Sequence, residues 1–275
     1  MIKKFKESFS INLRTLIARA YVRIVATHRE GSWIFLNGLT GIISLASYVY
    51  LYRNLGAKKI YEGFVIIGSF ILAFWINVLW SIASQLYWEK LSGNLRYFII
   101  APCSKMAILI GMSFGGIYMI LLRSSFVLFL AFFVFKTPLK YFNPLLIFLT
   151  FFITLFGLYG LGMAFSSLYL LWGREAWHLS SLFQEPIYAF SGLYYPIRVL
   201  PIFIVIIFSL IPLTLGLDAM RQCFYGKEAE GLLNVYLELI ILTFLSIIFI
   251  FLSYLSLKKM EEVARKKGTL IERWQ

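Results

Sequence analysis

Long uncharged stretches alternate with short charged segments along this sequence. Residues 31–52, 63–88, 141–173 and 239–257 contain no Asp, Glu, Lys or Arg. A helix needs about 20 predominantly apolar residues to cross a hydrocarbon core about 30 Å thick. Several such stretches in one chain exclude a soluble enzyme and predict an all-α polytopic membrane protein.

The apolar stretches predict six membrane spans, at 33–52, 64–87, 106–135, 145–172, 176–194 and 233–257. A further apolar run, 202–211, lies between Pro201 and Pro212 and reaches only about half of the bilayer. We therefore predict a re-entrant helical hairpin within 195–230 that enters from the outer face. Irregular backbone at membrane depth is tolerated where protein or water surrounds it, so the hairpin is expected to line or cap a pathway.

The two ends of the chain are basic. Residues 1–30 have apolar side chains at helical spacing between Lys and Arg, which predicts an amphipathic helix in the headgroup plane that anchors the chain or also touches a cytoplasmic partner. Residues 31–257 form the transmembrane domain, and 258–275 a basic tail. The predicted topology places 17 of the 26 Lys and Arg on one face. The positive-inside rule makes that face cytoplasmic, so both termini are expected in the cytoplasm. The expected location is the cell (inner) membrane.

The composition narrows the function. Charged residues make up 14% of the chain, against about 25% in globular domains. The net charge of +13 does not indicate nucleic acid, because the basic residues lie mainly at helix ends. Asp218 is the single Asp, and the two His and two Cys lack metal-ligand spacing, so we expect no metal or cofactor on this chain.

The segment 89–105, after the second predicted span, is amphipathic. Leu91, Leu95 and Phe98 follow helical spacing, and Pro102 interrupts the helix before the third span. The simplest interpretation is a short interfacial turn. The pattern Glu-x-x-x-Gly-x-Leu followed by Ala-Pro, however, resembles the coupling helix of ABC-2 type ABC transporter permeases, and its matching positions are Glu89, Gly93, Leu95, Ala101 and Pro102.

A second stretch resembles the same family. Its matching positions are Ser191, Gly192, Pro196, Pro201, Pro212 and Arg221, with Ile211 where Asn is common in the family. Asp218 lies in the same predicted re-entrant region. The family's outer re-entrant helices fall at this place, in agreement with the hairpin predicted from segment length.

The resemblance implies the permease subunit of an ATP-driven exporter for a drug-like (multidrug-type), lipid or other amphipathic substrate, or alternatively for a polysaccharide or glycolipid. It also implies a second permease copy, as a homodimer, and separate ATPase subunits that bind ATP and Mg²⁺. The chain has no Walker A motif, so we expect no enzymatic activity of its own. An ion-coupled transporter would often show internal repeats, and a membrane-embedded protease would want a Ser–His or paired-Asp site. Neither is evident here.

Three charged residues fall within predicted spans: Arg123, Glu185 and Glu238. Such residues are costly in lipid and face the bundle interior or a water-filled route. The depths of Arg123 and Glu185 allow an ion pair that either stabilises helix packing or lines the substrate route. Glycines in the third and fourth spans predict close helix packing within one subunit, with a dimer seam as the alternative.

Overall fold

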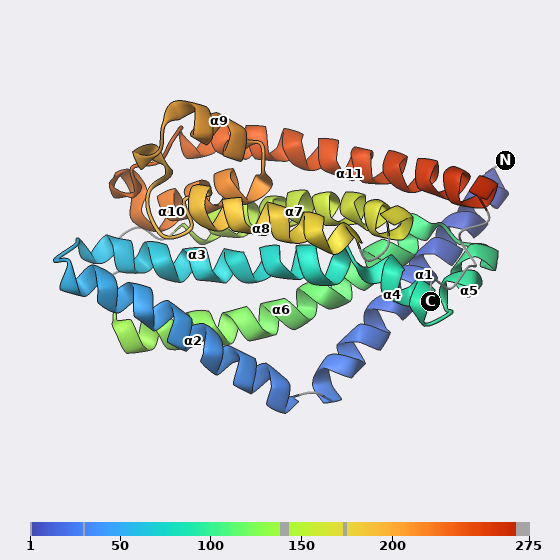
Figure 1. The fold of residues 1–275 in the computed structure, drawn as a ribbon, viewed down its shortest axis with the longest axis horizontal. Coiled ribbons are helices and arrows are strands. Elements are labelled where there is room, and N and C mark those ends of the chain that lie inside the picture. The colour runs from blue at the N-terminus through green and yellow to red at the C-terminus, as the bar shows by residue number, and fades with distance from the viewer. Residues whose placement is uncertain (1, 30, 138–142, 173–174, 268–275) are drawn as a thin grey trace.

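The computed structural model describes residues 2–29, 31–137, 143–172 and 175–267. All regular elements within those residues are helices (Figure 1). A helix satisfies its backbone hydrogen bonds internally, as a chain surrounded by lipid requires. The predicted all-α class is confirmed for this part of the chain.

Within the described residues, four helical segments are long and apolar enough to cross a membrane: Lys59–Leu91, Lys105–Phe135, Pro144–Tyr169 and Val235–Met260. They correspond to the second, third, fourth and sixth predicted spans. The count becomes five if α9 (Ile202–Ser209) and α10 (Pro212–Tyr225) are taken as one broken span. Helix α2 (Gly31–Asn54), at the first predicted span, has 24 residues, or about 36 Å of helix.

The second predicted span is a composite helix. Helix α3 (Lys59–Asn77) passes through a π-helical segment, η1 (Val78–Ile82), and continues as α4 (Gln85–Leu91). Asn77, at the start of the irregular turn, accepts a 2.8 Å hydrogen bond from the Tyr159 hydroxyl of α7 (Pro144–Trp172). A π-helical turn inside an α-helix often marks a functional position.

The fifth predicted span, 176–194, is too long. Helix α8 (Ala176–Phe190) has 15 residues, or about 22 Å, and contains Pro186. It ends at Ser191, and Gly192 follows with a φ of +70°. A glycine in this left-handed conformation stops the helix, a signal that hydrophobicity alone does not include.

The region of the predicted hairpin contains two short helices. After η3 (Ile197–Val199), α9 and α10 are bent by 102° at the break before Pro212, and η4 (Gly226–Ala229) follows α10. These elements lie at the left end of Figure 1 with the α2–α3 turn, opposite α4 and α5 (Leu95–Ile100).

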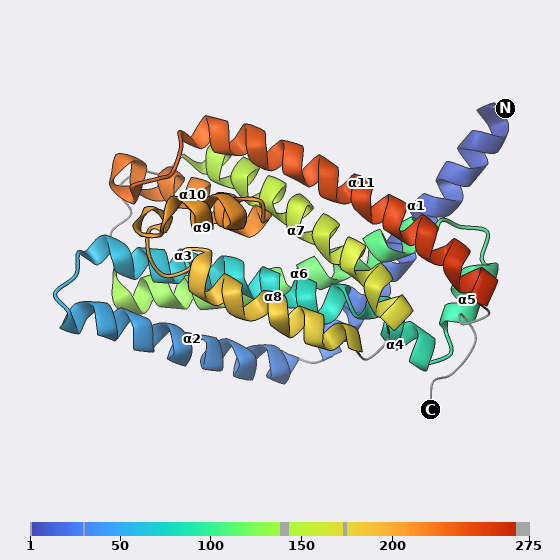
Figure 2. The same cartoon turned by 45° about the horizontal axis from the view of Figure 1, so that its top comes forward.

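Small residues allow the helices to approach closely. Helices α7 and α11 (Val235–Lys267) lie side by side (Figures 1 and 2), and a Cβ at Gly160 would lie 3.0 Å from the backbone nitrogen of Ile250. Ser246 of α11 donates a 3.0 Å hydrogen bond to the Ile153 carbonyl of α7. These glycines serve helix packing within one chain, as one sequence-based interpretation predicted.

Helix α1 (Ile2–Arg29) crosses α6 (Lys105–Phe135) and projects from the bundle at its N-terminal end (Figure 2). A Cβ at Gly111 of α6 would lie 2.6 Å from the Leu16 carbonyl oxygen, and Gly115 faces the Cβ of Arg23. Gly111 and Gly115, in the third predicted span, therefore allow α1 to pack closely against α6. The C-terminal end of α11 lies at the same end of the molecule as the start of α1 (Figure 1).

Helix α11 continues through Lys267, so the first part of the predicted basic tail is helical. Residues 268–275 lie outside the described residues, as do 138–142 and 173–174 in two predicted loops.

Candidate functional site

The segment 89–105 contains the end of α4 and one short helix, α5, instead of the single amphipathic helix expected. Helix α4 ends at Leu91, and α5 covers Leu95–Ile100. Gly93, between them, has a φ of +76°, which favours glycine and explains this position of the sequence motif. Pro102 follows α5 as predicted. We call residues 89–105 the coupling segment.

Glu89 accepts hydrogen bonds from both sides of the turn between α4 and α5. One carboxylate oxygen accepts a 3.0 Å hydrogen bond from Asn94, and the other accepts a 3.2 Å hydrogen bond from Gln85, one turn earlier on α4. In this arrangement the Glu89 carboxylate holds α4 and α5 together, and the conformation of the turn depends on it.

Helix α5 has one buried and one exposed face. Leu95 and Phe98 are buried, whereas Tyr97 and Ile100 are 59% and 77% exposed. Leu91, which was grouped with Leu95 and Phe98 by helical spacing, is exposed and precedes the turn at Gly93. The exposed face combines apolar surface with the exposed Arg96, a composition suited to contact with another protein.

Helix α1 holds the coupling segment through residues that sequence analysis did not select. The Arg19 guanidinium lies 4.0 Å from the centroid of the Phe98 ring. Asn12 accepts a 2.7 Å hydrogen bond from the backbone N–H of Ser104. Their only signal in the sequence is a place on the polar face of an amphipathic helix, which does not distinguish them from solvated residues.

Arg23 of α1 makes the central contact. Its guanidinium donates hydrogen bonds to Gln85 of α4 and, at 3.2 Å, to the Ser81 hydroxyl of η1. Burial lowers the pKa of Arg23 from its ordinary value, and the nearby Glu89 carboxylate opposes that shift. One side chain thus bridges α1, the π-helical turn and the helix that leads into the coupling segment.

A cavity of about 760 Å³ begins at the same turn. Trp80 and Ser81 of η1 line it, as do residues from α2, α3 and α6. Tyr188 of α8 and Tyr194 complete the described wall. In Figure 1, the gap between the α2 and α3 ribbons widens away from the turn that connects them. Both helices contribute lining residues to the cavity.

The structure places the three charged residues of the predicted spans in different surroundings. Arg123 lines the cavity from α6. Glu185 is exposed on α8 and is not among the described lining residues. Glu238 lies in the first turn of α11, where it is buried and accepts a 3.0 Å hydrogen bond from the Leu233 N–H. Of the three pathway candidates, Arg123 alone is placed at the cavity.

The second stretch that resembles the family, residues 191–221, is held together by Arg221 of α10. This residue is 1% exposed. Its guanidinium donates to the carbonyls of Gly192 and Leu193 at 2.6 Å each, Tyr195 at 3.1 Å and Phe64 at 3.2 Å. The Ser-Gly turn after α8 is thereby fixed to α10 and α3. The arginine of the motif thus holds the backbone of the turn in place.

A model of the ABC-2 type transporter family matches residues 12–225. The chain belongs to that family. The match begins within α1 and ends at the last residue of α10, so it includes the coupling segment, the cavity walls and the Arg221 contacts. No curated protein matches the chain significantly.

Membership in the ABC-2 family makes this chain a multi-pass membrane permease, and such permeases work with an ATP-binding subunit. The family is one of transport domains and not of ATPase domains, in agreement with the missing Walker A motif.

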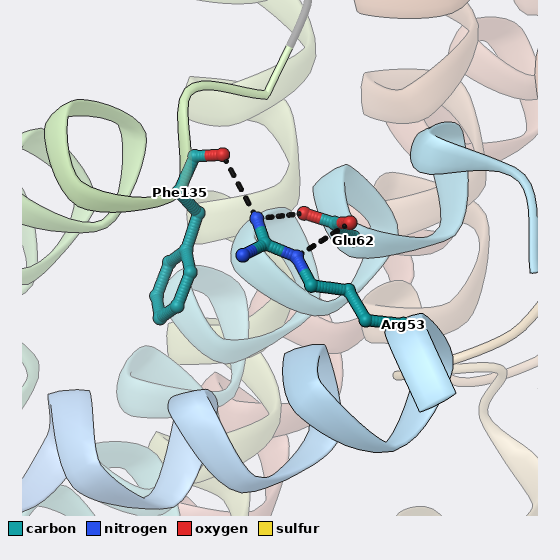
Figure 3. A network of polar contacts seen from close by, with 3 residues as sticks. All are labelled: Arg53, Glu62 and Phe135. Atoms are coloured by element: carbon teal, nitrogen blue, oxygen red, sulfur yellow. Dashed lines mark hydrogen bonds and ion pairs between the residues drawn. The ribbon is translucent and has the colours of Figure 1, made fainter. Parts of the chain in front are cut away.

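Two further contacts order the end of this ABC-2 chain that lies opposite the coupling segment. Asp218 accepts a 2.6 Å hydrogen bond from the Leu232 N–H, which fixes the approach of the chain to α11. Arg53 of α2 forms a 2.8 Å ion pair with Glu62 of α3 and donates to the Phe135 carbonyl of α6 at 3.1 Å (Figure 3). Sequence analysis missed this link because both residues are ordinary loop-flanking charges.

Proposed function

We propose that this ABC-2 chain is the permease subunit of an ATP-driven exporter that moves an amphipathic substrate from the cytoplasm or the inner leaflet. The coupling segment would receive the ATP-binding subunit on the exposed face of α5, and the cavity would form part of the substrate route. ATP and Mg²⁺ would be bound by that partner.

One observation supports this proposal more than any other. Arg23 contacts Ser81, which lines the cavity, and Gln85, which braces Glu89 in the coupling segment. A displacement of the coupling segment would therefore move the cavity wall at Ser81, which lies one helical turn from Gln85. ATP-driven closure of the partner would shift the population between cavity shapes through this contact.

In the proposed topology α1 lies along the cytoplasmic face and both termini are cytoplasmic. Helix α8, with the residues up to Pro196, would complete six crossings, and α9 and α10 would form the outer re-entrant pair. An even number of crossings agrees with the ends of α1 and α11 at one end of the molecule (Figure 1). We further propose that two copies assemble in the cell inner membrane, because six helices enclose a pathway poorly.

Photocrosslinking tests the docking face. A photoreactive amino acid at Tyr97 or Ile100 should capture an ATP-binding subunit in membranes from the native host. The matched control is Val199, which is 73% exposed at the opposite end of the molecule and should capture none. Capture from Val199, or capture of no ATP-binding protein from α5, would overturn the proposed function.

A further inference from the structure

The cavity has the size and lining of a small-molecule site. Its volume of about 760 Å³ falls in the range of about 300–1,000 Å³ that is typical of ligand pockets. Along α6 it extends from Met119 to Leu128, or about 14 Å of helix. A molecule with an apolar chain and a compact polar group fits these dimensions.

One residue gives the described lining of this cavity a formal charge. Among the described residues that line it, Arg123 alone carries a formal charge. Arginine offers several N–H donors in a planar fork, so it can hold a ligand anion beside any contacts it makes within the protein. A cationic ligand would meet like charge here, whereas a carboxylate or phosphate would gain a charge-assisted hydrogen bond.

Two serine hydroxyls of the lining are turned toward their own helices. Ser44 donates to the Thr40 carbonyl at 3.2 Å, and Ser124 donates to the Ile120 carbonyl at 2.7 Å. These two hydroxyls therefore offer mainly acceptor oxygens to a ligand. The guanidinium of Arg123 is the charged donor of the described lining.

Apolar side chains form part of the cavity wall, beside Tyr48 and Tyr194. Leu45, Ile66 and Leu128 line it there, and the buried cluster around Leu45 and Ile66 continues beyond them. The apolar chain of a ligand whose head is held at Arg123 would lie against these residues, out of water, as hydrophobic burial favours.

We propose that the cavity between α2, α3 and α6 binds amphipaths with one anionic group, a carboxylate or a phosphate, and that Arg123 is the anion-binding residue. The transport of such molecules rests on the proposed function, whereas their binding to the chain does not.

The test uses the full chain in phosphatidylcholine nanodiscs and three diazirine-bearing C12 probes: a dodecanoate, a dodecyl phosphate and a dodecyltrimethylammonium. Labelled residues are located by peptide mass spectrometry. Both anionic probes should label the Met119–Leu128 stretch of α6 more strongly than the cationic probe, and unlabelled anions should compete. Labelling by one anionic probe only would identify which head group the site accepts.

Substitutions assign the effect to one residue. Arg123→Gln should weaken anion labelling about tenfold, the factor expected for loss of a charged hydrogen bond. Arg123→Lys should retain most of it. The matched control, Arg96→Gln, changes an exposed arginine outside the cavity and should have no effect.

Equal labelling by the cationic and anionic probes in the unmodified chain would overturn the proposal, as would unchanged labelling of Arg123→Gln. The comparison of the probes uses the unmodified chain. It therefore tests the proposal even if the Arg123→Gln variant does not insert into the nanodisc. Anion binding without capture of an ATP-binding subunit from α5 would instead refute the proposed function and leave the binding site.

Discussion

Two regions of this chain differ in how their helices meet. Helices α7, α10 and α11 form what we call the packed half, in which glycines bring backbones into contact. Helices α2, α3 and α6 form the cavity half, which supplies most of the wall of the 760 Å³ cavity. No described residue of the packed half lines that cavity.

The difference shows where a conformational change can occur. Close-packed interfaces change between discrete arrangements at high cost, whereas a cavity leaves room for helices to move. The coupling segment contacts α1, and Arg23 of α1 joins α4 to η1 at the edge of the cavity half. We therefore expect displacement of the coupling segment to reshape the cavity while α7 and α11 remain in place.

The largest expected effect is at Arg221, where the two halves meet. Arg221→Met removes the donor from four carbonyl contacts, so it should lower the free energy of unfolding by about 3 kcal/mol or more. Thermal unfolding in detergent measures the loss. Arg198→Met, which removes one exposed contact to the Leu232 carbonyl, is the control and should cost less than about 1 kcal/mol. Equal losses would mean that the buried network does not hold the halves together.

A glycine in each half sharpens the comparison. Gly160→Val in the packed half places side-chain atoms against the Ile250 backbone and should destabilise by about 1–3 kcal/mol. Gly41→Ala in the cavity half meets only the Val127 side chain at 3.5 Å and should be nearly neutral. Thermal unfolding of both variants provides the measurement, and a larger loss for Gly41→Ala would reverse the assignment of the halves.

A smaller effect on stability, but a specific effect on coupling, is expected at Arg23. Arg23→Gln removes the bridge between Ser81 and Gln85, so substrate-stimulated ATPase activity of the assembled complex should fall about tenfold. The complex should still assemble, because Arg23 lies away from the exposed face of α5. Arg14→Gln, at an exposed position on the same helix, is the control. Normal stimulation in Arg23→Gln would remove this residue from the mechanism.

Much of the fold follows from hydrophobic runs and helix-breaking residues. The second, third, fourth and sixth predicted spans match helices within a few residues, because long apolar runs specify membrane helices strongly. The bend before Pro212 was also predictable from proline positions. The fifth span was predicted too long, because Gly192 ends α8 through backbone conformation inside an apolar run.

The candidate site was less predictable. The sequence motif places Glu89, Gly93 and Pro102 in one segment, but the contacts from Arg19 and Arg23 depend on how α1 crosses α6. That crossing is set by Gly111 and Gly115, whose partner helix is not evident from the sequence. Glu238 was grouped with Arg123 because both interrupt apolar runs, although the structure places Glu238 at the end of a helix.

The most direct test of the account compares distances in the two halves by pulsed electron paramagnetic resonance. Spin labels at the exposed Leu36 of α2 and Leu182 of α8, a helix that lines the cavity through Tyr188, report on the cavity. Labels at Phe148 of α7 and Ile240 of α11 report on the packed half. In the complex with its ATP-binding subunit, a non-hydrolysable ATP analogue should shift the first distance distribution and leave the second unchanged. An unchanged first distance, or equal shifts in both, would contradict the claim that the coupling segment acts on the cavity.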